Sequence, residues 1–223
     1  MRNRLILYGL IIACMPLTLW AAVIHVPGDC PAIQAAVDSC AGGDTVMVAP
    51  GVYSGDGNRD ISILAISITV ISSDGPLWTI IDGGNGYKGF NIIGGGAPAT
   101  VIEGFTIQNV SYGVYCDSAS VVMNNVIIED FLFRAIHFDG FLYDPPLTAD
   151  IDECIIHQID PSYQGTGIGF RGARSVIVSV YGSIFSDCLY GFEFHTLENR
   201  VPNFDIQKCV VRNNLLDGIW THS

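Results

Sequence analysis

The chain has 223 residues, of which 49% are apolar and only 14% are charged, so it is long and apolar enough to bury one sizeable core. Its 25 glycines and 10 prolines are too few for a collagen-like or a disordered chain. The formal net charge is −12, with 22 acidic residues against 10 basic ones. Nucleic acid and anionic membrane surfaces are therefore not expected as partners, because proteins bind both through clustered lysine and arginine.

Residues 1–22 are predicted to be a signal peptide. Arg2 and Arg4 precede an apolar run that continues to Ile24 and contains no acidic residue. A basic start followed by an apolar stretch is typical of an export signal. We therefore expect a protein that is secreted or displayed at the cell surface, with residues 23–223 as its single folded domain.

Two other interpretations of this start stay open. The apolar run is about long enough to be an uncleaved membrane anchor. The residues leading to Cys14 also resemble the cleavage box of a lipoprotein, which would be anchored by a lipid. Cleavage near Ala21 or Ala22 would leave six cysteines, an even number suited to disulfides in an exported chain, although the sequence does not select their pairing.

The segment from Asp29 to Cys40 contains the one clear helical pattern. Pro31 suits the first position of a helix, and Asp29 or Cys30 would cap it. The apolar face of this helix consists of Ile33, Ala36 and Val37. A disulfide between Cys30 and Cys40 requires the helix to be short and the chain to fold back after it, because a disulfide needs Cα atoms within about 7 Å.

After Gly43 the pattern changes to short runs of β-branched residues separated by Gly, Asn and Asp. Each run has the length of a β-strand and has turn residues on both sides. The predicted strands are Thr45–Val48, Ile66–Ile71, Thr79–Ile81, Val101–Ile107 and Val121–Ile128. No helical period recurs in this part of the chain, which therefore indicates an all-β domain.

Two units repeat along the chain. The first begins with a small residue followed by two apolar residues in alternation, and it starts at Gly89, Gly113, Ala135, Gly167, Gly191 and Gly218, at spacings of 24, 22, 32, 24 and 27 residues. The second starts at Phe105, Val126, Cys154, Ser183 and Cys209, and is followed four residues later by Asn109, Asp130, Gln158, Asp187 and Asn213. We expect this polar position to lie at a turn between strands.

Irregular repeats of this length predict a parallel β-helix, a solenoid in which each repeat is one coil. Equivalent strands of successive coils would stack about 4.8 Å apart, with alternate side chains inside. The helix would cover the open edges of the first coil. Cys116, Cys154 and Cys209 fall at inward positions and are expected to be core residues. A β-sandwich is the alternative, which does not account for a fixed two-unit repeat.

Two stretches resemble a known family. They are residues 26–53, with Val26-Pro27-Gly28 and Gly43-Asp44-Thr45, and residues 102–109, with Glu103-Gly104-Phe105. Together with the coil pattern, they resemble right-handed parallel β-helix proteins of the pectin-lyase-like superfamily, and in particular the exported bacterial β-helix repeat proteins. The resemblance covers about residues 24–223 and implies the fold strongly. It implies little about activity, because this scaffold serves lyases, hydrolases, esterases, adhesins and binding proteins.

The catalytic patterns of the enzymes in this superfamily are not found in the sequence. Hydrolases of this kind carry aspartates just before the glycine of the first unit. The matching residues are Tyr112, Arg134, Thr166, Tyr190 and Asp217, of which only the last is acidic. Glycoside hydrolysis normally needs two carboxyl groups at a set separation. The clustered aspartates and the arginine motif of pectate lyases are also missing.

The strand alternation predicts two outward columns on the first unit. One consists of Asn91, Tyr115, His137, Gly169, Glu193 and Trp220, and the other of Ile93, Asp117, Asp139, Arg171, His195 and His222. Stacking would bring His137, Asp139, Arg171, Glu193 and His195 into one patch. The simplest interpretation is a solvated outer face stabilised by cross-strand pairs such as Asp139 with Arg171.

Two functional interpretations of the same columns remain. Rings and mixed polar groups on a flat face suit sugar binding, by Tyr115, Asp117, His137, Asp139, Arg171, Glu193, His195 and Trp220. Catalysis would use His137, Asp139, Arg171, Glu193 and His195, because a histidine beside acids can transfer protons near neutral pH. The loop that follows Asp139 would form a wall beside the patch, or is a tolerated insertion.

No cofactor or metal is predicted, with one weak calcium candidate. Asp56, Asn58 and Asp60 alternate as calcium ligands do, but Ile61 stands at the sixth position and Ser67 at the twelfth, where a calcium loop carries Gly and Glu. A plain turn is the favoured interpretation.

The sequence as a whole favours an exported β-helix module that is not catalytic and that binds extracellular polysaccharide or serves as a surface scaffold. The rival is a polysaccharide-degrading enzyme, a lyase or a glycoside hydrolase, with a divergent site. The last repeat unit begins at Gly218 and has no closing segment after it. Because solenoids usually need caps to stay soluble, we expect a missing C-terminal region or a partner at this open coil.

Overall fold

The computed structural model describes residues 21–94, 98–139, 147–160, 165–171, 176–195 and 203–222. Residues 1–20 of the predicted signal peptide and the loop after Asp139 lie outside this description. No helix in the described segments has the length and apolar character needed to cross a membrane.

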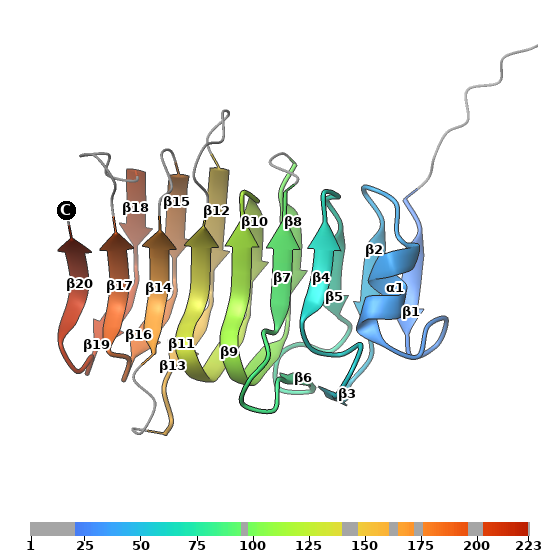
Figure 1. Cartoon of the computed structure of the whole chain (residues 1–223), viewed down its shortest axis with the longest axis horizontal. Helices are drawn as coiled ribbons and strands as arrows, with labels where there is room; N and C mark the ends of the chain where they lie inside the picture. The colour runs from blue at the N-terminus through green and yellow to red at the C-terminus, as the bar shows by residue number, and fades with distance from the viewer. Residues whose placement is uncertain are drawn as a thin grey trace, which may run out of the picture.

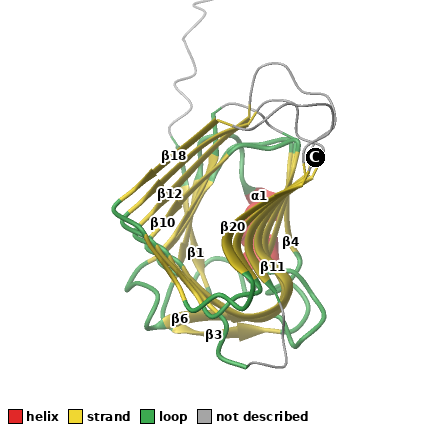
Figure 2. Cartoon of the chain, turned by 90° about the vertical axis from the view of Figure 1, so that its left-hand side faces the viewer, coloured by secondary structure: helices red, strands yellow, loops and turns green. Residues whose placement is uncertain are grey.

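The described chain winds in about seven turns, and each turn adds one strand to each of three stacked faces (Figures 1 and 2). Face 1 is the eight-stranded sheet of β1 (Val23–Val26), β2 (Thr45–Val48), β5 (Thr69–Ser72), β8 (Thr100–Glu103), β10 (Val121–Asn124), β12 (Leu147–Asp152), β15 (Val176–Tyr181) and β18 (Asn203–Gln207). Faces 2 and 3 form one twelve-stranded sheet, because β9 (Thr106–Asp117) and β11 (Ile127–Asp139) run through both.

The remaining strands belong to one of these two faces each. Face 2 also contains β3 (Gly51–Ser54), β6 (Thr79–Asp82), β13 (Ile155–His157), β16 (Ile184–Ser186) and β19 (Val210–Arg212). Face 3 also contains β4 (Ile61–Leu64), β7 (Phe90–Ile93), β14 (Thr166–Arg171), β17 (Tyr190–His195) and β20 (Asp217–His222). All pairings are parallel and join successive coils, so the parallel β-helix is confirmed and the β-sandwich is rejected.

Strand register confirms both repeat units. On face 3, Val114, Ile136, Ile168, Phe192 and Ile219 lie one above another. On face 2, Thr106, Ile127, Ile155, Ile184 and Val210 do the same. Three predicted strands have wrong bounds. The runs from Val101 and from Val121 each break into two strands, and the run from Ile66 becomes a strand only at Thr69. The chain turns between faces 1 and 2 at Gly104 and Asn125, which both have positive φ.

The recurring small residue of the first unit has a steric cause. A Cβ atom added at Gly89, Gly113, Gly167 or Gly191 would lie only 2.4–2.6 Å from a backbone carbonyl oxygen of the next coil. Real Cβ atoms essentially never approach so closely. The glycines therefore permit the coils to stack at strand spacing where the chain enters face 3.

The polar position of the second unit lies at a turn, as predicted. Asn109, Asp130, Asp187 and Asn213 all have φ between 53° and 61°, a left-handed conformation that Asn and Asp adopt more readily than other residues with a side chain. Gln158 departs from the pattern. Its buried side chain accepts a hydrogen bond from the Phe131 backbone N–H at 3.4 Å and donates one to the Phe131 carbonyl at 3.3 Å.

The interior is filled by the inward apolar residues of all three faces. Phe138 and Phe170 stack with ring centroids 5.0 Å apart, and Phe185 packs on Phe192 at 4.6 Å. Cys116 and Cys154 are buried in this core, and Cys209 packs against it, which confirms their predicted inward positions. All six described cysteines are free thiols.

The helix α1 (Ile33–Ser39) covers the first coil, but its start differs from the prediction. It begins at Ile33 rather than Pro31, and neither Asp29 nor Cys30 caps it, since the N-cap residue is Ala32 and no side chain of the cap accepts a hydrogen bond. Asp29 instead accepts a hydrogen bond from the His25 backbone N–H. Asn58 of the first coil, distant in sequence, accepts the N–H of Ile33 at 3.1 Å.

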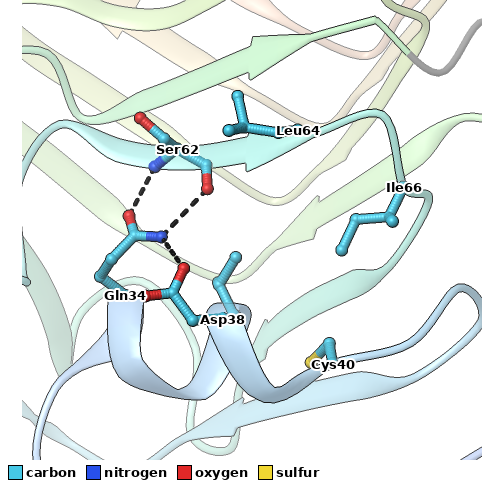
Figure 3. Close-up of a pocket in the computed structure, with 7 residues that line it drawn as sticks. Gln34, Asp38, Cys40, Ser62, Leu64 and Ile66 are labelled. Atoms are coloured by element: carbon cyan, nitrogen blue, oxygen red, sulfur yellow. Dashed lines mark hydrogen bonds between the residues drawn. The ribbon is translucent and has the colours of Figure 1, made fainter.

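Gln34 closes the edge of β4 in place of a neighbouring strand (Figure 3). Its carboxamide oxygen accepts the Ser62 N–H at 2.7 Å, and its nitrogen donates to the Ser62 carbonyl at 3.1 Å and to Asp38 at 2.7 Å. A cavity of about 220 Å³ lies beside this contact, lined by residues that include Cys40, Leu64 and Ile66. The helix thus protects the first sheet edge, as the sequence predicted.

Candidate functional site

The two predicted columns lie on the outer surface of face 3. Register pairs Tyr115 with His137, and then His137 with Gly169 and Gly169 with Glu193. Asp117, Asp139 and Arg171 form the second column in the same three coils. The backbone of His195 lies beside Arg171, but the side chains of His195 and His222 lie outside the description.

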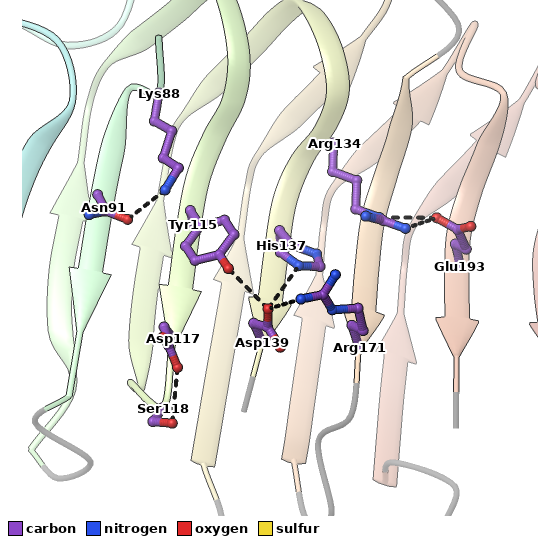
Figure 4. Close-up of polar contacts among 10 residues, drawn as sticks. All are labelled: Lys88, Asn91, Tyr115, Asp117, Ser118, Arg134, His137, Asp139, Arg171 and Glu193. Carbon is purple, nitrogen blue, oxygen red and sulfur yellow. Dashed lines mark hydrogen bonds and ion pairs between the residues drawn. The ribbon is translucent and has the colours of Figure 1, made fainter. Parts of the chain in front are cut away.

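Asp139 is the centre of a polar cluster contributed by three strands (Figure 4). Its Oδ2 atom accepts hydrogen bonds from the Tyr115 hydroxyl on β9 and from Arg171 Nη2 on β14, both at 3.0 Å. His137, two residues away on β11, places Nε2 at 4.0 Å from the same oxygen. Coil stacking therefore brings together residues that are up to 56 positions apart in the sequence.

The cluster is not the solvated outer face that the simplest interpretation predicted. His137 is only 2% exposed, Asp139 is 6% exposed, and Glu193 is buried as well. The rings of Tyr112 and Tyr115 lie 5.5 and 5.0 Å from the His137 ring and shield it. In contrast, the side chain of Arg171 is 61% exposed, so the cluster reaches solvent mainly through its guanidinium group.

His137 is held in its neutral form. Burial lowers the pKa of this imidazole to about 4, and the charge of Arg134 lowers it too, while Asp139 opposes the shift. Its Nδ1 atom and the Oδ1 atom of Asp139 are buried, and neither finds a hydrogen-bond partner among the described residues. Burial and the bond to Asp139 also raise the pKa of Tyr115 to about 12, so its hydroxyl keeps the proton that it donates.

Arg134 belongs to the cluster and was not predicted as a site residue. Its side chain lies over Gly169, where a Cβ would lie 2.0 Å from Nε, and reaches Glu193 two coils away. Nε and Nη2 lie 3.0 and 2.8 Å from the same Glu193 oxygen. The sequence signal for this contact is the glycine itself, because an outward column position without a side chain leaves room for a long neighbour.

Lys88 was missed as well, since it precedes the first unit. Its Nζ atom lies 3.9 Å above the Tyr115 ring and donates a hydrogen bond to Asn91 at 3.0 Å. A cation above an aromatic face is attracted to the ring quadrupole. Lys88 and Asn91 thus extend the cluster by one coil toward the N-terminus.

Two predicted ligand-binding residues are not hydrogen-bonded to Asp139. Asp117 accepts a hydrogen bond from the neighbouring Ser118 hydroxyl at 3.1 Å and is not bonded to Asp139 (Figure 4). Trp220 is paired in register with Glu193 and stacks on Tyr190 with centroids 5.1 Å apart. Three rungs separate Trp220 from His137, or about 14 Å at strand spacing.

Comparison with known families shows that the β-helix is right-handed and identifies the family of the chain. A family model described as "right handed beta helix region" matches residues 88–223. The chain belongs to this family. The match fits the resemblance to the pectin-lyase-like superfamily and covers all of the polar cluster. A comparison with curated proteins finds no match.

In this right-handed β-helix protein, the side chains of the calcium candidate, Asp56, Asn58 and Asp60, already form hydrogen bonds or an ion pair with other residues. Asn58 Oδ1 accepts the N–H of Ile33, and Asp60 Oδ1 accepts the N–H of Lys88 at 2.7 Å. Asp56 pairs with Arg59 at 3.3 Å. Within the described residues no three His, Cys, Asp or Glu side chains are grouped as metal ligands would be.

Proposed function

We propose that this β-helix domain binds polysaccharide on face 3 without cleaving it. The observation that carries the proposal is the cluster around Asp139, in which groups from three coils are held in place by one another before any ligand arrives. A fixed arrangement of rings and hydrogen-bonding groups lowers the entropy cost of binding. Arg171, which is anchored by Asp139 yet largely exposed, supplies donors for sugar hydroxyls.

The charges of the cluster favour an uncharged, hydroxyl-rich polymer. Asp139 pairs with Arg171, and Glu193 pairs with Arg134, so the four ionised groups nearly cancel. A polyuronate would be repelled by the net charge of −12 on the chain, which outweighs the single positive charge that Lys88 adds at the edge of the cluster. Neutral polysaccharides therefore suit this surface better than pectin or alginate.

The rival function is degradation of the polymer at the same cluster. One observation favours it, namely that His137 Nδ1 and Asp139 Oδ1 are buried without partners, and such atoms recur at catalytic sites. Three others oppose it. His137 is neutral and shielded by rings, Glu193 is bound by Arg134, and glycoside hydrolysis needs two carboxyl groups free to act.

Binding and turnover measured on the same polymers separate the two functions. We expect the chain to bind xylan or glucomannan more tightly than pectin or alginate in calorimetry, with no release of reducing ends or unsaturated products. Arg171→Ala should weaken binding at least roughly tenfold, as expected when a charged hydrogen-bond donor is lost, while Lys208→Ala, far from the cluster, should not. Turnover that disappears in both His137→Ala and Arg171→Ala would establish the enzyme instead.

We also propose that the domain acts outside the cytoplasm. The support is the basic and apolar sequence of residues 1–22, which is typical of an export signal. Expression with the native N-terminus followed by sequencing of the exported protein should place its first residue near Ala22 or Val23. Recovery of the intact chain from the cytoplasm alone would contradict this.

A further inference from the structure

Asp44 holds the start of the first coil in place through both of its carboxylate oxygens. Oδ1 accepts the backbone N–H of Ala22 at 2.8 Å, and Oδ2 accepts the backbone N–H of Ala41 at 2.7 Å. Asp44 itself is only 8% exposed. Because it directly precedes β2, its side chain ties the residue before β1 to the turn that leads from α1 into β2.

The carboxylate of Asp44 is ionised and forms no ion pair with a described residue. The hydrogen bonds from the N–H groups of Ala22 and Ala41 lower its pKa, although burial opposes the shift. None of the ion pairs within the described segments includes it. A positive charge at one of its two donors would therefore strengthen the contact, since hydrogen bonds between two ionised groups are stronger than those with a neutral donor.

The titratable group beside Asp44 is the thiol of Cys40, which follows the last residue of α1. Burial raises the pKa of Cys40 to about 11, with smaller contributions from the charge of Asp44 and from Cys30. The thiol therefore stays neutral at neutral pH. It neither supplies a cation to Asp44 nor competes for one.

The folded domain begins at the residue that Asp44 holds. The Ala22 carbonyl accepts the N–H of Thr45 at 2.8 Å, and the register of β1 with β2 starts at the next residue, Val23. Ala21 precedes the strand and is exposed, and a small residue at this point suits the cleavage site of an export signal. The bond between Ala21 and Ala22 thus joins the predicted signal peptide to the first residue that the fold uses.

We propose that Asp44 binds a new N-terminus, the α-ammonium group that forms at Ala22 when the Ala21–Ala22 bond is hydrolysed. The inference rests on the proposed export of the chain. Hydrolysis by an export endopeptidase consumes one water and, at neutral pH, leaves a carboxylate on Ala21 and an ammonium on Ala22. The existing hydrogen bond then becomes an ion pair between Asp44 and the first residue of the mature domain.

Cleavage at other bonds does not give this contact. A cut after Ala22 removes both the N–H that Asp44 accepts and the carbonyl that Thr45 uses, and it leaves a buried carboxylate oxygen without its partner, which is costly. A cut before Ala21 leaves an amide rather than an amine at Ala22. Hydrolysis of the Ala21–Ala22 bond is therefore the one that supplies a cation to Asp44 and removes no hydrogen bond.

The ion pair makes the stability of the mature chain depend on pH in one direction. An α-amine has an ordinary pKa of about 7.7–8.0, and an opposite charge in contact raises it. Because the folded-state pKa is then the higher one, the stabilisation is complete below about pH 7.7 and is lost as the pH rises through the folded-state value. Acetylation of the amine recreates the amide of the uncleaved chain, so it should abolish this dependence.

Export of the full-length chain with its native start, followed by N-terminal sequencing, tests the position of the cut. We expect the mature protein to begin at Ala22. An intact chain would overturn both this inference and the proposed export. A first residue of Val23, or of Cys14 as in a lipoprotein, would overturn this inference alone and leave export in place.

The pH dependence of acetylation by acetic anhydride tests the role of Asp44, with the N-terminal peptide followed by mass spectrometry. We expect the midpoint of the rate profile to lie about one pH unit or more above that of Asp44→Asn, which makes acetylation of the mature chain at pH 7 roughly tenfold slower. The matched control is Asp29→Asn, because Asp29 also accepts a backbone N–H of β1, from His25 at 2.8 Å, but is exposed. This control should react as the mature chain does. Equal midpoints in the mature chain and Asp44→Asn would overturn the proposal.

A second measurement keeps Asp44 and its hydrogen bond, and so does not depend on how well Asp44→Asn folds. Enzymatic acetylation, confined to the α-amine, removes only the charge at Ala22. In urea unfolding at pH 7, the mature protein should unfold at a higher urea concentration than its acetylated form. The two midpoints should converge as the pH rises above the pKa of the amine, and equal midpoints at pH 7 would overturn the ion pair.

Discussion

At the scale of single residues, Asp139 connects the cluster on face 3. Its Oδ2 atom is shared by Tyr115 and Arg171, and its negative charge opposes the lowering of the His137 pKa. Because the carboxylate is buried, its partners depend on it more than partners at an exposed ion pair would. The change that isolates this role keeps the shape of the side chain and removes only its charge.

Asp139→Asn should destabilise the protein by about 1–3 kcal/mol, since a buried charge-assisted bond to Arg171 is lost. Urea unfolding measures this free energy. Asp117→Asn is the matched control, because Asp117 lies in the same column one coil away and bonds only to Ser118 among the described side chains. Equal effects of the two substitutions would contradict the central position of Asp139.

The depressed pKa of His137 predicts a loss of stability in acid. The folded-state pKa of about 4 lies below the ordinary 6.5, so between these values the unfolded chain binds more protons than the folded one. The stabilisation is fully present above about pH 6.5 and is lost as the pH falls toward 4, at up to about 1.4 kcal/mol per pH unit. His137→Gln should flatten this part of a stability profile measured by urea unfolding.

Nuclear magnetic resonance provides an independent check on the same group. The ring protons of His137 should not titrate between pH 7 and 5. His157 should titrate above the ordinary value, since its hydrogen bond to Glu129 raises its pKa although burial opposes this. A His137 titration midpoint near 6.5 would contradict the buried, neutral imidazole.

The sequence predicted which residues share a column, but it did not predict their burial. Alternation along a strand fixes only the side of the sheet on which His137 and Asp139 lie. Their shielding comes from Tyr112, from Tyr115 and from the Arg134 side chain that crosses Gly169. Those contacts depend on side-chain length and direction between coils, which the strand period does not encode.

At the scale of elements, β14 shows why glycine recurs in the first repeat unit. A Cβ at Gly167 would lie 2.4 Å from the Gly191 carbonyl oxygen, which is held in the next coil. A Cβ at Gly169 would lie 2.0 Å from Arg134 Nε, which belongs to a flexible side chain. The shorter contact is therefore the easier one to relieve.

Gly167→Ala should cost more stability than Gly169→Ala, at about 3 kcal/mol or more against about 1 kcal/mol, because backbone cannot move aside as a side chain can. Thermal unfolding of the two variants gives the order. Gly169→Ala should also separate Arg134 from Glu193 and increase the exposure of both. A larger loss at Gly169 than at Gly167 would contradict the steric explanation of the repeat.

The helix and the split strands show where element prediction failed. The pattern placed the apolar face of α1 correctly, but the helix end is capped from Asn58, 25 positions after Ile33, rather than by the adjacent Asp29. Local signals cannot reveal a cap from another coil. Similarly, the run from Val121 reads as one strand because its corner residue, Asn125, is a single position with φ of 50°.

At the scale of the whole molecule, the solenoid was predictable because its evidence is the repetition itself. Two units recur in order, and stacking them gives one interior in which Phe138, Phe170 and Phe185 are all buried. The register then follows from aligning the units, with no need for contacts between distant segments to be guessed. Features that do not repeat, such as the cap from Asn58 or the Arg134 side chain, are the ones that this reasoning missed.

The linear stacking of the coils also predicts how far along the solenoid a core substitution should lower local stability. Phe138 and Phe170 stack across the contact between the fourth and fifth coils. Phe138→Ala should cost about 3–5 kcal/mol, as buried aromatic truncations do. Because the backbone pairings join only successive coils, the loss should appear as local opening around β11 and β14 rather than as uniform weakening.

Hydrogen exchange measured by mass spectrometry distinguishes these outcomes. Amides of β11, β14 and their neighbours should exchange faster in Phe138→Ala, while those of β2 and β5, at the end covered by α1, should keep their protection. The reverse experiment uses Phe90→Ala, which removes the ring packed 6.0 Å from Phe105 and should open the N-terminal coils first. If both variants lose protection equally over all coils, the molecule unfolds as a single cooperative unit. The free energy that couples neighbouring coils must then exceed the stability lost by truncating either phenylalanine.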